Sequence, residues 1–204
     1  MTASIKNIIF DVGQVLIKYK PLKNLEKALQ DKILAKDVYT KTFGSQDWLK
    51  LDRGLVTREE LVTELGQRYP ELEDIIAESI RNWPEFLEPV PENASLLEKL
   101  KESDYHLYYL SNFPREGFKE TQEIFPYLKI FEEGVISGET GYIKPEPGIY
   151  RALIAKTDLE PSLSLFIDDC QENLTAAEKF GFQTVHYTAE TDLREKLLEY
   201  QIKI

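Results

Sequence analysis

The sequence predicts an α/β fold in which a parallel β-sheet is flanked by helices and interrupted by a helical insert. Short, dense apolar runs recur along the 204 residues, and each run stops at a polar or turn residue. Dense rather than alternating runs are typical of strands that are buried on both faces of a parallel sheet. Helical patterns separate these runs, and strand–helix–strand alternation indicates a doubly wound sheet.

Four runs are predicted to be strands of this sheet. Three of them end directly before residues whose side chains can carry out chemistry, and the fourth closes the series. A strand with this composition and length has no alternating face, so we expect all four to lie inside the sheet. The runs are Ile8–Phe10, Leu107–Leu110, Leu163–Ile167 and Thr184–Tyr187.

Helical spacing of apolar residues predicts three helices between these strands. Leu96, Leu97 and Leu100 share one helical face, and Gly181 supplies a stop signal after the last helix. The predicted helices are Pro91–Glu102, Pro147–Lys156 and Asn173–Phe180.

The segment from Lys18 to Glu88 contains no strand-like run and is predicted to be helical. Thr57 and Glu60 form a capping-box pattern at the start of one helix. We expect residues 1–17 and 88–204 to form a Rossmann-like core, residues 18–87 to form a helical cap, and the sheet to resume near Val90. The helices predicted in the insert are Leu22–Gln30, Ile33–Thr42, Thr57–Tyr69 and Leu72–Ile80.

Composition narrows the class of protein. The chain has 25 Lys and Arg against 36 Asp and Glu, which gives a net charge of −11. Such a surface repels phosphate backbones and anionic lipids, so we expect neither nucleic-acid nor membrane binding. No apolar stretch reaches the roughly 18 residues of a membrane helix, and the apolar run at the N-terminus stops too early for a signal peptide. One cysteine is compatible with a reducing compartment, so we expect a cytoplasmic protein.

Polar side chains at successive strand ends predict one functional site. Asp11, Ser111-Asn112 and Asp168-Asp169 each follow a predicted strand, and ligands of parallel sheets bind at this edge. Each residue alone would be an ordinary turn residue, but their joint placement is a stronger signal. Converging carboxylates repel one another unless a hard cation such as Mg²⁺ lies between them. Lys144, in a loop rich in Gly and Pro, can add a positive charge for a phosphate.

Four short motifs occur in order along the chain. They are Phe10-Asp11-Val12-Gly13-Gln14-Val15-Leu16, Leu110-Ser111-Asn112, Lys144-Pro145, and Phe166-Ile167-Asp168-Asp169 followed by Asn173. In this order they resemble the motifs of the haloacid dehalogenase superfamily, and the resemblance covers nearly the whole chain, including a helical cap between the first two motifs. The sequence resembles in particular sugar phosphatases of the glucose-1-phosphate type and the phosphatase domain of soluble epoxide hydrolase.

This resemblance implies a Mg²⁺-dependent phosphatase that acts on a small phosphorylated metabolite, such as a sugar phosphate, through an aspartyl-phosphate intermediate. The implied roles are nucleophile for Asp11, phosphate binding for Ser111, Asn112 and Lys144, and Mg²⁺ binding for Asp11, the Gly13 carbonyl, Asp168 and Asp169. Ser111 and Lys144 also count as catalytic residues, because they stabilise the transferring group and the nucleophile.

Gly13 departs from the pattern of most phosphatases of the superfamily, which have a second Asp two residues after the nucleophile as general acid. Glycine cannot donate a proton from a side chain, so the acid for the leaving group is unassigned. Two alternatives therefore stay open. A haloacid dehalogenase would use Asp11 to attack carbon and needs no metal, which the Asp168-Asp169 pair argues against. A non-catalytic protein that binds phosphorylated metabolites is suggested only by Gly13.

The remaining candidate residues favour structural roles. His106, His186 and Cys170 make a poor zinc-binding set, and acidic neighbours of Cys170 would raise the pKa of its thiol. Tyr19, Trp48 and Trp83, all within the predicted cap, could line a pocket for a sugar ring. Packing within the cap is the favoured interpretation of these aromatic residues.

Overall fold

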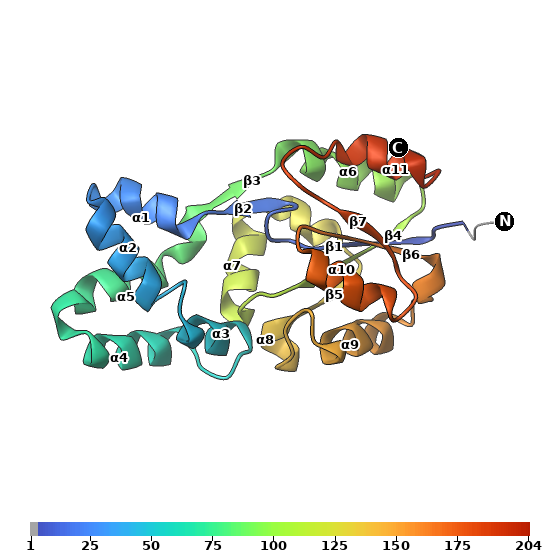
Figure 1. Cartoon of the computed structure of the whole chain (residues 1–204). Helices are drawn as coiled ribbons and strands as arrows, with labels where there is room; N and C mark the ends of the chain where they lie inside the picture. Colours follow the sequence, from blue (N-terminus) through green and yellow to red (C-terminus); the bar gives the residue numbers. More distant parts are fainter. Residues whose placement is uncertain (1–3) are drawn as a thin grey trace.

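The structure is a computed structural model that describes residues 4–204. Five parallel strands form one sheet in the order β5-β4-β1-β6-β7, and β1 lies at its centre (Figure 1). The α/β fold class with a Rossmann-like parallel sheet is thus confirmed. The strands are β1 (Asn7–Phe10), β4 (His106–Ser111), β5 (Glu133–Ile136), β6 (Ser164–Asp168) and β7 (Gln183–His186).

Four of these strands coincide with the predicted runs, and β5 is the strand that the prediction lacks. β5 spans Glu133–Ile136 and pairs only with β4 at one edge of the sheet. It contributes two adjacent apolar residues after Glu133-Gly134, which is too short a run to stand out from a loop. Gly134 lies so close to Tyr109 of β4 that a Cβ atom would approach the Tyr109 ring to 2.4 Å.

Helices cover both faces of the sheet and form two separate apolar clusters. Ile8 and Phe10 of β1 pack in the cluster on one face, with α6, α7 and α11, whereas Ile9 packs on the other face with α9 and α10. Alternate residues of a strand point to opposite faces, so both sides of β1 are buried. These helices are α6 (Pro91–Glu102), α7 (Arg115–Ile124), α9 (Pro147–Thr157), α10 (Gln171–Glu178) and α11 (Leu193–Glu199).

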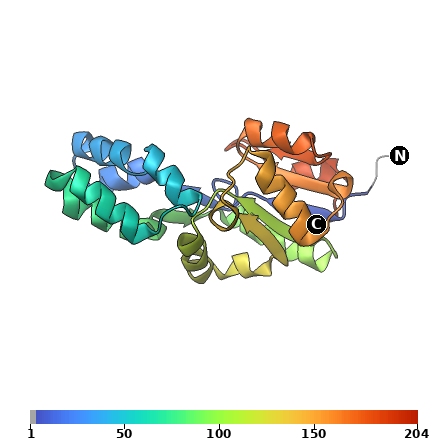
Figure 2. The same ribbon diagram turned by 90° about the horizontal axis from the view of Figure 1, so that it is seen from below.

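The helices between β2 and β3, α1 to α5, form a group that extends to one side of the sheet (Figures 1 and 2). Within the group α1 packs on α2 and α4 packs on α5. The Thr57–Glu60 capping box at the start of α4 is confirmed. Short 3₁₀ turns follow α4 and α5. The helices are α1 (Pro21–Leu29), α2 (Lys32–Lys41), α3 (Gln46–Asp52), α4 (Arg58–Arg68) and α5 (Glu73–Arg81).

Two predictions about this segment are wrong. The chain enters and leaves the helical group through a two-stranded antiparallel ribbon, β2 (Ile17–Tyr19) and β3 (Leu87–Pro89), which falls partly inside the segment expected to lack strands. The sheet also does not resume near Val90, because α6 follows β3 and the next strand of the sheet begins at His106. Three-residue strands carry too little pattern to be detected from sequence. Within residues 4–204 no helix combines the length and the apolar character needed to cross a bilayer.

Candidate active site

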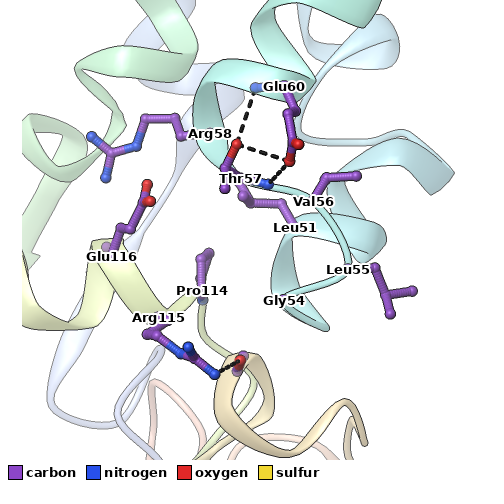
Figure 3. A pocket seen from close by; sticks show the side chains of 12 residues that line it. Leu51, Gly54, Leu55, Val56, Thr57, Arg58, Glu60, Pro114, Arg115 and Glu116 are labelled. Carbon is purple, nitrogen blue, oxygen red and sulfur yellow. Dashed lines mark hydrogen bonds between the residues drawn. The ribbon is translucent and has the colours of Figure 1, made fainter.

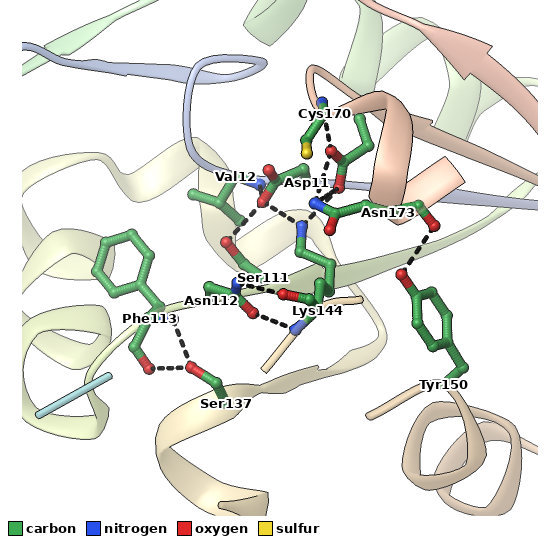
Figure 4. A network of polar contacts seen from close by, with 11 residues as sticks. Asp11, Val12, Ser111, Asn112, Phe113, Ser137, Lys144, Tyr150, Cys170 and Asn173 are labelled. Atoms are coloured by element: carbon green, nitrogen blue, oxygen red, sulfur yellow. Dashed lines mark hydrogen bonds and ion pairs between the residues drawn. The ribbon is translucent and has the colours of Figure 1, made fainter. Parts of the chain in front are cut away.

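Three neighbouring strands bring Asp11, Ser111 and Asp168 to the same edge of the sheet. β1 lies between β4 and β6, so the residues at the carboxyl ends of these strands meet. Ser111 Oγ donates a hydrogen bond to Asp11 Oδ1 at 2.7 Å (Figure 4). All three side chains are buried. The structure therefore confirms the prediction that these three residues lie close together.

Lys144 carries the positive charge at the centre of this group. Its side chain is 1% exposed, and its Nζ atom lies 3.0 Å from Asp11 Oδ1 and 2.7 Å from Asp168 Oδ2. Burial acts to lower the pKa of this lysine, but the attraction of the two carboxylates outweighs burial and raises it. The ammonium group is therefore charged at neutral pH and offsets one carboxylate charge.

The two carboxylate oxygens of Asp11 have different surroundings. Oδ1 accepts hydrogen bonds from the Val12 amide and the Ser111 hydroxyl, both at 2.7 Å, and also contacts the Lys144 ammonium. Within residues 4–204, Oδ2 receives no hydrogen bond. Burial raises the pKa of Asp11 to about 6, even though Lys144 acts in the opposite direction. One oxygen is thus held in place while the other is available for chemistry.

Asn112 positions the loop that carries Lys144. Its side chain accepts a hydrogen bond from the Lys144 amide at 2.7 Å and donates one to the Lys144 carbonyl at 3.1 Å. Both ends of the amide are engaged, which fixes the backbone from which the ammonium group extends. A phosphate-binding role for Asn112 stays a prediction.

Asp11, Asp168 and Asp169 form an acidic cluster. One carboxylate oxygen from each lies within 4.8 Å of the others. Burial and the neighbouring Asp168 raise the pKa of Asp169, because a second negative charge is costly there. Three carboxylates against the single Lys144 ammonium leave two negative charges uncompensated. An oxygen-only donor set with this charge deficit fits a hard divalent cation such as Mg²⁺.

Asp168 and Asp169 differ in how many contacts they already make. Asp168 is fully buried and accepts hydrogen bonds from the Cys170 amide at 2.7 Å and from Asn173 at 3.0 and 3.1 Å, besides its contact with Lys144. Asp169 is exposed, and its carboxylate makes no hydrogen bond to a side chain in the described part of the chain. Asn173 therefore fixes the Asp168 carboxylate through its side-chain amide, a role that was not predicted from the sequence.

Gly13 lies in the turn after Asp11. Its carbonyl accepts a hydrogen bond from the Val15 amide at 2.7 Å, and this leaves one lone pair of the oxygen for another ligand. A Cβ atom at position 13 would meet no other atom within 4 Å, so open space faces this residue. A metal-binding role for the Gly13 carbonyl stays a prediction.

Comparison with known families decides the class of this site. Residues 5–181 match the family model of the haloacid dehalogenase-like hydrolases, and this span contains Asp11, Ser111, Lys144 and the Asp168-Asp169 pair. The chain belongs to this family.

Individual relatives of this hydrolase include two curated phosphatases. A sesquiterpene phosphatase of Aspergillus oryzae is 27% identical over 92% of each chain. A D-ribitol-5-phosphate phosphatase of Bacteroides thetaiotaomicron is 27% identical over 95% of this chain and 97% of its own length. A Bacteroides thetaiotaomicron enzyme of the family, crystallised with magnesium and inorganic phosphate, superposes with a TM-score of 0.77, at 26% identity over 95% of this chain and 99% of that chain.

The aromatic residues of the hydrolase that were singled out in the sequence pack together. Tyr19, Trp48 and Trp83 form edge-on contacts, with ring centroids 5.6 Å apart for Tyr19–Trp83 and 5.7 Å for Trp48–Trp83. The favoured interpretation as packing residues is therefore confirmed. The same three side chains also line a chamber of about 120 Å³ that reaches Gly13 and Asn112. The same aromatic cluster therefore packs within the protein and forms part of the chamber wall.

Within residues 4–204, neither the two histidines nor the cysteine of the hydrolase belongs to a group of three or more side chains that could hold a metal ion. His106 is exposed and contacts Glu132, and His186 Nε2 lies 3.0 Å from the Asp169 carbonyl. Burial raises the pKa of the Cys170 thiol, and a hydrogen bond to Glu172 adds to this effect. The thiol is therefore a weak nucleophile, as predicted.

A second cavity of the hydrolase, of about 180 Å³, lies between the helical insert and α7 (Figure 3). None of the predicted site residues lines it. One of its walls is the turn at Gly54, which has a φ of +67°, and a Cβ atom there would come within 2.3 Å of the Gly138 carbonyl. Only glycine allows this close approach of the insert to the core.

Arg53 clamps the insert to the loop that carries Lys144. Its guanidinium makes a two-pronged pair with Glu146, at 3.0 and 2.5 Å, and also donates to the Gly141 carbonyl at 3.0 Å. Glu146 in turn accepts a hydrogen bond from the Ile143 amide. These contacts connect the end of α3 with both sides of the loop, and no feature of the sequence pointed to the pairing.

We expect Arg53→Ala to raise KM by several-fold and to change kcat little, because the clamp aligns the insert with the core but touches no reacting atom. A partly exposed two-pronged pair contributes on the order of 1 kcal/mol. A double-mutant cycle with Glu146→Ala measures the coupling. Arg81→Ala is the control, since Arg81 makes the same type of pair with Glu59 inside the insert. A coupling of zero between Arg53 and Glu146 would contradict the clamp.

Proposed function

We propose that this hydrolase is a Mg²⁺-dependent phosphatase of a small phosphorylated metabolite, with Asp11 as nucleophile. The observation that carries the proposal is the arrangement at Asp11. Its Oδ1 atom is held by Val12, Ser111 and Lys144, while its Oδ2 atom is free of hydrogen bonds from residues 4–204. A carboxylate fixed in this way can direct one oxygen at phosphorus and form an aspartyl-phosphate, which water then hydrolyses.

The residues around Asp11 would serve the phosphoryl group. The Ser111 hydroxyl and the Lys144 ammonium both contact Asp11 Oδ1, so they lie beside the nucleophile and can stabilise negative charge on the phosphoryl oxygens. Asn112 keeps Lys144 in position through the loop backbone. A net charge of −11 repels an anionic substrate at long range, so local positive charge has to capture it.

Asp11, Asp169 and the Gly13 carbonyl would hold Mg²⁺, with Asp168 next to them. Asp168 is already engaged by Lys144, Asn173 and the Cys170 amide, whereas Asp169 is exposed and has free lone pairs. We therefore assign direct binding to Asp169 and a supporting position to Asp168. When bound, the cation supplies charge neutralisation for the equatorial phosphoryl oxygens.

We also propose that residues 18–87 act as a cap that selects the alcohol part of the substrate. The insert joins the core through the β2–β3 ribbon, and its aromatic cluster faces the turn at Gly13. The two curated phosphatases described above are named for a sesquiterpene and for D-ribitol 5-phosphate. The alcohol parts of these two substrates, a terpene and a sugar alcohol, differ strongly in chemistry. A common phosphate site combined with a variable chamber in the cap accounts for such a difference.

The test is release of inorganic phosphate from a panel of sugar, polyol and prenyl phosphates, measured with Mg²⁺ and with excess EDTA. We expect turnover that depends on Mg²⁺ and stops in EDTA. A parallel assay for halide release from 2-haloacids addresses the dehalogenase alternative. Full activity in EDTA would contradict the metal-dependent mechanism, halide release without phosphate release would favour the dehalogenase, and binding of phosphate esters without turnover would favour the non-catalytic alternative.

A further inference from the structure

Asp52 is the carboxylate of the helical insert that lines the chamber next to Gly13. It is the last residue of α3, and the chamber also includes Tyr19, Trp48, Trp83 and Asn112 in its walls. Gly13 and Asn112 both line it, and they lie two residues after Asp11 and one residue after Ser111, so this chamber borders the candidate site. An alcohol attached to a phosphoryl group at Asp11 would extend into it.

The Asp52 carboxylate has no partner in the structure. Within residues 4–204 no side chain or amide donates a hydrogen bond to it, and the adjacent Arg53 is engaged by Glu146. Two further polar atoms of the chamber walls, Tyr19 Oη and Trp83 Nε1, are buried and also lack hydrogen-bond partners among the described residues. Trp83 is only 2% exposed. Unpartnered buried polar groups are costly in a folded protein, so these two buried atoms, together with the half-buried and unpaired Asp52 carboxyl, indicate a polar ligand atom in the chamber.

The core holds Asp52 in this position by contacts of its backbone. Ser137 Oγ donates a hydrogen bond to the Asp52 carbonyl at 2.5 Å and accepts one from the Phe113 amide at 2.8 Å. The close approach of Gly54 to Gly138 fixes the following turn. The end of α3 is therefore anchored to the core while the Asp52 side chain is left free.

We propose that Asp52 donates a proton to the leaving alcohol and so replaces the acid that is missing at Gly13. This inference rests on the proposed phosphatase function. The open space at Gly13 marks where an acid could be placed on the core, and Asp52 supplies a carboxyl group from the wall of the chamber that Gly13 also lines. Trp48 lies one helical turn before Asp52 on the same face of α3, which makes the surroundings of the carboxyl apolar.

Asp52 gives up one proton and regains one in each catalytic cycle. Asp11 Oδ2 forms a bond to phosphorus as the bond from phosphorus to the alcohol oxygen breaks, and that oxygen takes the proton of the Asp52 carboxyl. The products of this step are the free alcohol, the aspartyl-phosphate and the Asp52 carboxylate. Asp52 then accepts a proton from water as the water oxygen attacks phosphorus and the bond from phosphorus to Asp11 Oδ2 breaks, which releases inorganic phosphate and restores the Asp11 carboxylate and the protonated Asp52 carboxyl.

The protonation state of Asp52 suits this role. Burial raises the pKa of Asp52 to about 7, so a large share of the carboxyl groups carry a proton near neutral pH. Tyr19 faces it from β2, and burial together with the charge of Asp52 raises the pKa of Tyr19 well above its ordinary value, so this phenol stays neutral. A general acid is most effective when its pKa lies near the working pH.

The decisive experiment compares leaving groups in the wild type and in Asp52→Asn under single-turnover conditions with Mg²⁺. The substrates are 4-nitrophenyl phosphate, whose leaving group needs no proton, and n-propyl phosphate, whose leaving group does. We expect Asp52→Asn to slow n-propyl phosphate by about 10²- to 10⁴-fold and 4-nitrophenyl phosphate by less than about threefold. Asp47→Asn is the matched control, because Asp47 lies on the same helix but pairs with Lys50 and Arg68.

Gly13→Asp in the Asp52→Asn background supplies a rescue. The new side chain has space at position 13, and we expect it to restore part of the rate with n-propyl phosphate. A readout that needs no substrate is thermal unfolding. Asp52→Asn should have a higher Tm than the wild type, and the gain should grow from pH 5 to pH 8 as the unpaired Asp52 carboxyl of the wild type loses its proton.

The possible outcomes distinguish failure of the Asp52 role from failure of the phosphatase function. Equal slowing of both substrates, or no slowing of either, overturns the role of Asp52 as proton donor while the phosphatase function stands. A Tm gain that does not grow with pH shows that Asp52 is not an unpaired carboxyl with a raised pKa, and this result also overturns its role as proton donor. If the wild type releases phosphate from neither ester nor from any compound of the wider panel, the proposed function fails and this inference fails with it.

Discussion

Asp11→Asn is expected to abolish phosphate release, with a loss of about 10³-fold or more in kcat for every substrate. The substitution keeps the shape of the side chain, and its amide oxygen can still accept the hydrogen bonds from Val12 and Ser111. It removes the negative oxygen that attacks phosphorus, so no covalent intermediate forms. Rates under single-turnover conditions, together with acid quenching to look for the aspartyl-phosphate, measure the effect.

The fold should survive this change. Lys144 keeps its contact with Asp168 at 2.7 Å, so no buried ammonium is left without a carboxylate. Circular dichroism and Tm are expected to match those of the wild type or to exceed them. Asp37→Asn, at an exposed ion pair of α2, is the matched control and should retain full activity. Phosphate release from Asp11→Asn at a rate near the wild type would overturn the assignment of the nucleophile.

Lys144→Met is expected to have the second large effect, on both rate and stability. Methionine fits the space of the lysine chain but leaves Asp11 and Asp168 buried without the ammonium group between them. Breaking a buried ion pair in this way costs about 3–5 kcal/mol. The loss of charge at the phosphoryl group should lower kcat/KM by about 10²- to 10³-fold. Urea unfolding and steady-state kinetics measure the two losses.

Mg²⁺ separates the two effects of this variant. The cation can offset the carboxylate repulsion and should stabilise Lys144→Met more than the wild type, while the rate stays low because no ammonium is present for the phosphate. Lys156→Met is the control, since the half-exposed Lys156 pairs with Glu133 at 3.0 Å and should contribute less than about 1 kcal/mol. A Lys144→Met variant as stable as the wild type in the absence of Mg²⁺ would contradict the central role of this ion pair.

Much of the core could be predicted from local patterns. The runs ending at Asp11, Ser111 and Asp168 are dense apolar segments, and such segments are buried wherever they occur in an α/β protein. Helices α6 and α9 begin at Pro91 and Pro147, where proline signals a first turn. The edge strand β5 and the ribbon strands β2 and β3 lacked such signals, because short strands depend on their partners rather than on their own sequence.

The site was predictable to the extent that topology alone brings residues together. Parallel strands end at the same edge of the sheet, and this rule is sufficient to place Asp11 beside Ser111 and Asp168, although each of these two lies 100 residues or more from Asp11 in the sequence. Lys144 was assigned to the site because of the Lys144-Pro145 motif, since it lies in a loop and does not follow a predicted strand. The clamp of Arg53 on Glu146 had no comparable rule, since it joins two segments 93 residues apart on the surface of different parts of the molecule.

The sequence by itself determined the fold class, the family resemblance and the set of residues at the strand ends, because these follow from local hydrophobic patterning and from the order of short motifs. Only the tertiary structure decided that Asp52 faces the chamber at Gly13. Trp48 and Asp52 share a helical face, but α3 was not predicted, and its orientation depends on Ser137 and on the approach of Gly54 to Gly138. The environment of a carboxyl group is set by which segments enclose it, and that information lies in contacts between distant residues.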